Sequence, residues 1–158
     1  MPKKILLISV HPEHATNIFD GFKKVELRRV RPNVSSGDLV LVYVSTPVQA
    51  LVGAFDVDKV VDAKPGVLWD QVKEVACVSR ERFDNYYDGA TKAYGIFVQE
   101  VRRLPTPVHL GSLRGIFTGF HPPQSYRYVT PVEAAAIDSI SHQIMRRDLL
   151  QRMPAHVR

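Results

Sequence analysis

Apolar residues recur along the chain in patterns that predict about five or six strands. Runs rich in valine, isoleucine and leucine are typical of buried strands, and strict alternation of apolar and polar residues is typical of a half-buried strand. The strands predicted in this way cover residues 5–10, 24–30, 39–44, 48–61 and 94–101. Gly53 predicts a bulge within the fourth strand. Pro105 and Pro107 are expected to end the fifth strand.

Apolar residues at helical spacing predict four helices. They cover residues 12–20, 67–75, 79–89 and 131–151. Pro12 suits the first turn of the first helix, and Gly21 ends it. Thr130 and Glu133 form a capping box that begins the last helix. Residues 109–125 show neither the helical spacing nor the alternation of a strand, and they are expected to be irregular.

The order of these elements predicts an α+β fold. Strands follow one another too directly for a doubly wound parallel sheet. A mixed or antiparallel β-barrel of about five or six strands, with flanking helices and a C-terminal helix, agrees better with the pattern. The chain has 158 residues, 45% of them apolar, which favours one folded domain over two and excludes an intrinsically disordered chain.

Several classes of protein are excluded by what the composition lacks. Cys77 is the only cysteine, so neither a disulfide-framed secreted scaffold nor a cysteine-rich zinc fold is expected. No apolar run reaches the roughly 18 residues of a membrane helix, and we expect a cytoplasmic protein. His11 and His14 have a spacing compatible with metal, but the other histidines are scattered. We therefore expect no metal and no cofactor.

Charge is distributed unevenly along the chain, which has a formal net charge of +5. Residues 1–31 carry seven basic and three acidic residues, residues 32–100 carry six and ten, and residues 101–158 carry eight and three. If the two basic ends meet in space, they form a face suited to a polyanion such as nucleic acid. The alternative is that the net charge has no role in binding and is the modest charge of an ordinary globular protein.

The densest polar cluster lies at the start of the second predicted strand. Glu26 and Arg28 project to one face of that strand, and Lys23 comes just before it. This pattern is typical of a solvated, charged strand face. In a half-buried cleft the same residues can read the edge of a base, and a lysine beside other cations can act as a base or nucleophile.

Gly21, Lys23, Glu26 and Arg28 match the motif G-x-K-x-x-E-x-R, and through it the chain resembles the ASCH domain family of the PUA-like superfamily. The resemblance extends over about residues 5–129. It implies a barrel with a cleft, in which the ligand-binding residues are Lys23, Lys24, Glu26, Arg28, Ser45, Gln124, Ser125 and Tyr126.

The resemblance also implies a function in RNA or nucleotide recognition, with a regulatory role in transcription or translation. The alternative that it implies is hydrolysis, with Lys23 and Glu26 as catalytic residues. The substrate is then RNA, as for a ribonuclease, or a modified nucleoside, as for a related amidohydrolase. In the amidohydrolase pattern a threonine stands where this chain has Glu26. The threonine hydroxyl that would act as the nucleophile is therefore absent from this chain. A third alternative is a protein-interaction module.

Two further groups have alternative interpretations. Tyr86 and Tyr87, with Phe83 and Trp69, have the helical spacing of core residues, although such rings can also stack on bases. We expect residues 131–158 to form a C-terminal extension to a barrel domain of residues 1–130. Its apolar stripe predicts a helix packed on the barrel, and its arginines leave open a homodimer contact or a basic arm on nucleic acid.

Overall fold

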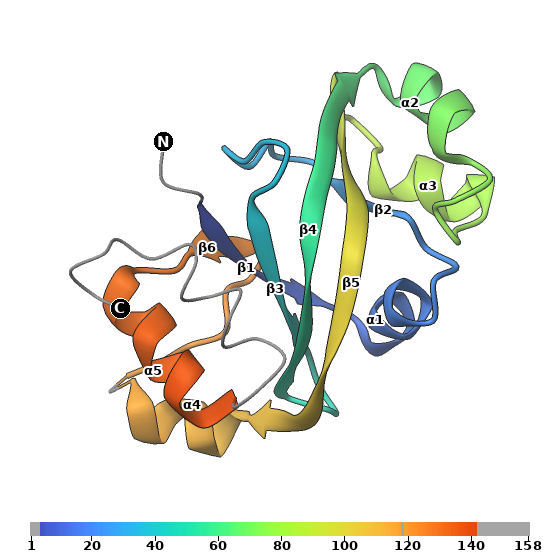
Figure 1. Ribbon diagram of the computed structural model, residues 1–158. Coiled ribbons are helices and arrows are strands. Elements are labelled where there is room, and N and C mark those ends of the chain that lie inside the picture. The colour runs from blue at the N-terminus through green and yellow to red at the C-terminus, as the bar shows by residue number, and fades with distance from the viewer. Residues whose placement is uncertain (1–3, 118, 142–158) are drawn as a thin grey trace.

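The computed structural model describes residues 4–117 and 119–141, which form one six-stranded sheet flanked by helices (Figure 1). The strands are β1 (Ile5–Val10), β2 (Val25–Arg28), β3 (Leu39–Val44), β4 (Ala50–Ala63), β5 (Ala93–His109) and β6 (Tyr126–Tyr128). The helices are α1 (Pro12–Phe19), α2 (Pro65–Val72), α3 (Arg80–Tyr86), α4 (Leu110–Ile116) and α5 (Pro131–Ser141).

The sheet is mixed and curls into half a barrel. Its strand order is β2-β5-β4-β3-β1-β6, with β1 and β3 parallel and every other pair antiparallel. Strands β2 and β6 therefore form its two edges. The α+β class and the mixed, barrel-like sheet predicted from the sequence are confirmed.

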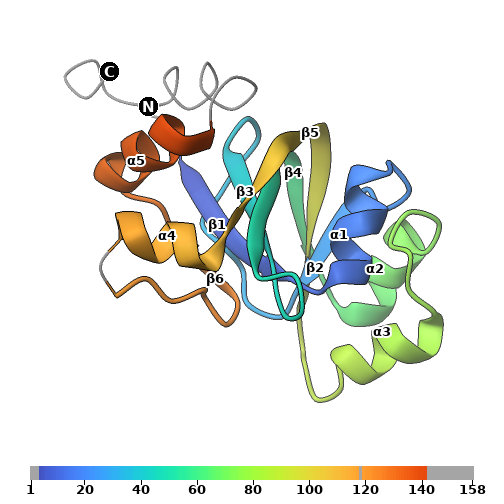
Figure 2. The same ribbon diagram turned by 90° about the horizontal axis from the view of Figure 1, so that it is seen from below.

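Helices cover both faces of the sheet, which explains the unbroken apolar runs of β1 and β3. Figures 1 and 2 show α1, α2 and α3 on one side and α4 and α5 on the other. Leu7 and Leu41 face the core under α4 and α5, whereas Ile8 and Val42 face the core under α1. A strand buried on both faces needs apolar residues at every position.

Strand β5 extends past the point where the sequence predicted its end. Pro105 and Pro107 lie within it, in a bulge between the pairs Gly53–Arg103 and Leu51–Val108. Proline lacks a backbone N–H, and a bulge is a part of the ladder where that donor is not required. The predicted bulge at Gly53 is confirmed. A side chain at Gly53 would collide with the carbonyl oxygen of Arg102.

Helix α4 lies in the segment 109–125, which was wrongly expected to be irregular throughout. Its sequence contains Gly111 and Gly115, which are poor helix formers. Leu113 is buried against the sheet, and this packing stabilises a helix that the local propensity does not predict. Residues 142–158, including residues 142–151 of the predicted C-terminal helix, lie outside the described residues. No helix among the described residues is long and apolar enough to cross a membrane.

Candidate functional site

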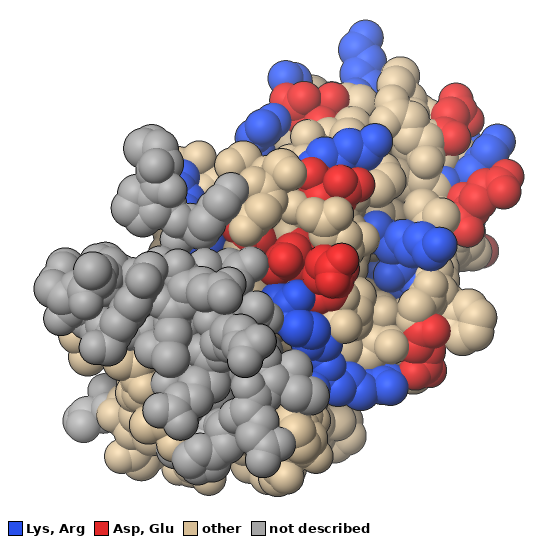
Figure 3. All heavy atoms as spheres, viewed as in Figure 1, with Lys and Arg blue, Asp and Glu red and all other residues tan. Residues whose placement is uncertain are grey.

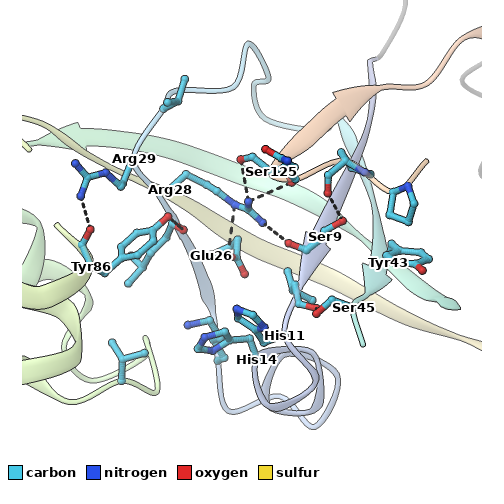
Figure 4. Close-up of a pocket in the computed structure, with 18 of the residues that line it drawn as sticks. Ser9, His11, His14, Glu26, Arg28, Arg29, Tyr43, Ser45, Tyr86 and Ser125 are labelled. Carbon is cyan, nitrogen blue, oxygen red and sulfur yellow. Dashed lines mark hydrogen bonds and ion pairs between the residues drawn. The ribbon is translucent and has the colours of Figure 1, made fainter. Parts of the chain in front are cut away.

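A cavity of about 780 Å³ opens where the sheet edge β2 approaches the other end of the sheet. It is bounded by the end of β1, the start of α1, strand β2, the turn after β3, helix α3 and the loop before β6. Segments far apart in sequence therefore meet around one space (Figure 4). A volume of this size is typical of small-molecule sites.

The cavity brings together six of the eight residues predicted to bind a ligand. Its lining includes Lys23, Glu26, Arg28, Ser45, Gln124 and Ser125. Lys24 and Tyr126 do not line it. Lys24 is exposed, and its backbone N–H donates to the carbonyl oxygen of Val75. Tyr126 packs against the apolar core, and its hydroxyl donates to the carbonyl oxygen of Arg31 at 3.4 Å.

Strand β2 presents Glu26 and Arg28 to the cavity because its side chains alternate. Val25 and Leu27 point the other way, into the cluster formed with α2 and α3. Gly21, with a positive φ of 87°, makes the turn that leads from α1 into this strand. The period of two in the sequence thus correctly placed both charged side chains on one face.

Arg28 is held by acceptors on both neighbouring segments. One terminal nitrogen donates to the carbonyl oxygen and the hydroxyl of Ser125 at 3.2 and 3.1 Å, and the other donates to the carbonyl oxygen of Ser9 at 3.1 Å. Its Nε lies 3.6 Å from Oε1 of Glu26. The guanidinium therefore joins edge strand β2 to β1 and to the loop before the opposite edge strand, β6. Its contacts make it a residue that closes the half-barrel.

Glu26 carries the unsatisfied group of the site. The residue is only 6% exposed, and its Oε2 has no hydrogen-bond partner among the described residues. A buried carboxylate oxygen without a donor is costly, by about 1–3 kcal/mol or more. Glu26 is one of the residues that line the cavity.

Two further titratable side chains at the cavity are Lys23, which is buried, and His14, which is partly buried. Lys23 is 3% exposed and donates from Nζ to the carbonyl oxygen of Ala76 at 2.5 Å. Burial lowers its pKa, and the carboxylate of Glu26 opposes that effect. Burial also lowers the pKa of His14, and the charge of Lys23 adds to this. Nδ1 of His14 has no hydrogen-bond partner among the described residues.

Sequence reasoning missed other residues that line the cavity. Tyr43 lies in a continuous apolar strand, so its hydroxyl gave no signal, yet that hydroxyl is buried without a hydrogen-bond partner in the described structure. Gln49 lines the cavity from the turn after β3 and has a positive φ of 51°. Arg29 and Arg82 also line it, as does Tyr86, which the sequence had already indicated as a core residue or a ring able to stack on bases. Their charge or ring was visible in the sequence, but their approach depends on the tertiary fold.

The histidine pair lies at the same cavity. His11 and His14 have ring centroids 6.2 Å apart. Within the described ranges, no group of three or more His, Cys, Asp or Glu side chains is arranged to hold a metal ion. The chemistry that this site offers from its own side chains is hydrogen bonding, charge and proton transfer.

Comparison with known proteins identifies the family. The family model of the ASCH domain matches residues 8–105. The chain belongs to the ASCH domain family. A protein of Zymomonas mobilis named ASCH domain-containing ribonuclease is 28% identical over 142 residues, covering 90% of this chain and 95% of that protein. The crystal structure of ASCH from Zymomonas mobilis superposes with a TM-score of 0.82 at 28% identity, covering 87% of this chain and 95% of that one.

A more distant structure shares the fold alone. Human THYN1, solved in complex with DNA containing 5-methylcytosine, has a TM-score of 0.58 and 14% identity to this ASCH domain. The family match of this ASCH domain contains Lys23, Glu26 and Arg28, whereas the loop with Ser125 lies beyond its end at residue 105. The structure shows that Arg28 connects the two parts.

Proposed function

We propose that this ASCH domain binds RNA by taking one nucleotide unit into the cavity. The observation that carries the proposal is the buried, unpartnered Oε2 of Glu26. Every nucleobase offers at least one N–H donor on its pairing edge, and a carboxylate is a strong acceptor for such a donor. The other groups of the cavity, among them Lys23, Arg29 and Arg82, carry the positive charge that a phosphate requires.

We assign different roles to Glu26 and Arg28, which were both expected to recognise the edge of a base. Both terminal nitrogens of Arg28 already donate to protein oxygens, so Arg28 is a positioning residue. Lys23 donates to one carbonyl oxygen, and an ammonium has three N–H groups. We assign base-edge recognition to Glu26, with Ser45, Gln124 and Ser125 completing the wall, and we assign contact with phosphate or a base carbonyl to Lys23.

RNA is the polymer we favour because the Zymomonas relative is named a ribonuclease. The test is fluorescence anisotropy with a labelled single-stranded RNA oligonucleotide. Glu26→Gln keeps the shape of the side chain but removes the charge, and we expect it to lower affinity by about tenfold, since a hydrogen bond to a charged group contributes about 1.5–3 kcal/mol. Glu74→Gln, at an exposed position away from the cavity, is the matched control. Equal affinity of Glu26→Gln and the wild type would overturn the proposal.

Hydrolysis of RNA is a second candidate, favoured by the name of the same relative, which matches over 95% of its length. Lys23 and Glu26 are the proposed catalytic residues. The lowered pKa of Lys23 increases the neutral amine, the form that acts as a base or nucleophile. Incubation of labelled RNA with the purified protein tests this. We expect cleavage that Lys23→Ala abolishes while the DNA of the same sequence stays intact. No cleavage by the wild type would exclude this candidate.

Three predictions from the sequence belong to this proposal. We propose a cytoplasmic location, a regulatory role in transcription or translation, and a homodimer formed through residues 131–158. Among the described residues, Ala134 and Ile137 of α5 are buried against the protein's own sheet. Any dimer contact through this extension therefore involves other residues. Analytical ultracentrifugation of the full chain distinguishes monomer from dimer.

A further inference from the structure

Tyr86 differs from the other phenylalanine and tyrosine residues that line the cavity. Phe83 and Tyr43 are 1% and 2% exposed and belong to the core, whereas Tyr86 is 42% exposed. Phe83 and Tyr87 account for the core packing of α3, and Trp69 packs against them. A large ring left in water forgoes the stabilisation that its burial would give. Core packing therefore does not explain why an aromatic residue stands at this position.

The ring of Tyr86 is nevertheless held in place. Its hydroxyl donates to the carbonyl oxygen of Leu27 at 3.3 Å, and its edge meets the ring of Tyr87 at a centroid distance of 4.8 Å and an angle of 73°. Its backbone carbonyl oxygen accepts from Arg29 at 2.5 Å. Tyr87 adds a bond from its own hydroxyl to the carbonyl oxygen of Arg28 at 3.2 Å. A ring fixed in this way loses little conformational entropy when a ligand covers it.

Tyr86 and Glu26 line the same cavity, with Tyr86 on one side of Glu26 and Ser45 on the other in the view of Figure 4. A planar ligand whose edge meets the free oxygen of Glu26 can thus lay its face on the tyrosine ring. Arg29 and Arg82 line the same cavity and supply positive charge there. This combination of acceptor, ring face and cations matches a base with its phosphate.

We infer that Tyr86 is a stacking platform for the bound base, and that the ligand is an unpaired nucleotide of single-stranded RNA. The inference rests on the proposed function and gives its substrate class. A base inside a duplex has both faces stacked and its pairing edge occupied, so it cannot meet Tyr86 and Glu26 together without leaving the helix. The exposed, immobilised ring thereby selects single strands over duplexes.

The test uses the full chain and an RNA oligonucleotide that carries a fluorescent base analogue quenched by stacking. The same oligonucleotide annealed to its complement is titrated alongside. We expect the single strand to bind at least about tenfold more tightly than the duplex and its fluorescence to fall on binding. Tyr86→Ala should weaken binding by about tenfold or more and remove the quenching, because stacking on an aromatic ring has effects of this order.

Two variants separate stacking from a structural role. Tyr86→Phe keeps the ring but lacks the hydroxyl bond to Leu27, and we expect binding within about threefold of the wild type. Tyr128→Ala removes a ring that is 44% exposed but does not line the cavity, and binding should be unchanged. If Tyr86→Ala binds and quenches like the wild type, or if the duplex binds equally well, the inference is overturned. If Glu26→Gln still weakens binding in that case, the proposed function stands. A wild-type protein that binds no RNA overturns both.

Discussion

Glu26 and Arg28 show how two residues of one strand face acquire different tasks. The alternation of β2 puts both at the cavity, and this much follows from the sequence. Their different tasks follow from partners far away in the chain: Ser125 and Ser9 accept from Arg28, whereas Oε2 of Glu26 has no partner among the described residues. Residue type and spacing predict which side chains share a face. Which of them remain available for a ligand depends on tertiary contacts that no local pattern encodes.

Lys23 is expected to destabilise the fold while serving the site. Burial lowers its pKa below 10.5, so at about pH 7 this amine disfavours the folded protein relative to the unfolded chain, in which it is fully solvated. Lys23→Met should therefore have an equal or higher free energy of unfolding at about pH 7, together with weaker RNA binding.

The pH dependence of this effect provides the control. Between the lowered pKa and 10.5 the unfolded chain binds more protons than the folded one, so the wild type gains stability as the pH rises through this window. Lys23→Met lacks that gain, and its advantage should shrink toward about pH 10. Urea unfolding at both pH values measures it. A Lys23→Met protein that is markedly less stable at about pH 7 would contradict the prediction, because it would show that the buried amine of Lys23 does not destabilise the fold.

His14 gives a prediction of the same sign at lower pH, because burial lowers its pKa too. Burial lowers its pKa below 6.5, so on acidification the unfolded chain takes up this proton before the folded protein does. Its contribution to stability is therefore present above about pH 6.5 and is lost as the pH falls below that value. We expect the melting temperature of the wild type to fall more between about pH 7 and about pH 5 than that of His14→Gln. Parallel acid profiles of the two proteins would contradict this.

At the scale of elements, the strands were predicted better than the connections between them. Strands β1 and β3 have unbroken apolar runs because both of their faces are covered. Such runs can be recognised from the sequence alone. The continuation of β5 through Pro105 depends on a bulge opposite β4, and α4 forms in spite of two glycines because Leu113 is buried. Both features depend on packing against distant segments, so local propensity gave no sign of them.

Arg28 also affects how the elements are held together, because it links elements at the two edges of the sheet. Arg28→Gln should lower the free energy of unfolding by about 3–5 kcal/mol, since it removes the partner of a buried carboxylate and the donors to Ser125 and Ser9. The loop before β6 should then exchange its amide hydrogens faster, as hydrogen–deuterium exchange would show.

Arg80→Gln is the matched control for this variant. Arg80 is a half-exposed arginine whose Nε lies 3.0 Å from Asp84 one turn along α3. Surface pairs of this kind contribute about 0.3–0.5 kcal/mol, so little change is expected. If the two variants lose the same stability, Arg28 does not close the half-barrel.

At the scale of the whole molecule, the positive charge is not gathered into one uniform face on the side shown in Figure 3, where Lys and Arg alternate with Asp and Glu. Several basic side chains that do not line the cavity are paired with acids, among them Arg80 with Asp84 and Arg103 with Asp20. The net charge of +5 is therefore a weak guide to nucleic-acid binding here. Only the cations at the cavity belong to the proposal. The salt dependence of RNA binding can distinguish their contribution from that of other basic residues.

The salt dependence of RNA binding tests whether the interaction is local. If the phosphate contacts are limited to two or three cations of the cavity, such as Lys23, Arg29 and Arg82, the slope of log affinity against log salt should be about −1.4 to −2.1 for a single strand. Anisotropy titrations between about 50 and 200 mM salt give this slope. A basic arm formed by the arginines of residues 142–158 would add contacts and steepen it beyond about −4. Deleting those residues should then leave the slope unchanged if binding is local, and a shallower slope after deletion would assign the extra contacts to the arm.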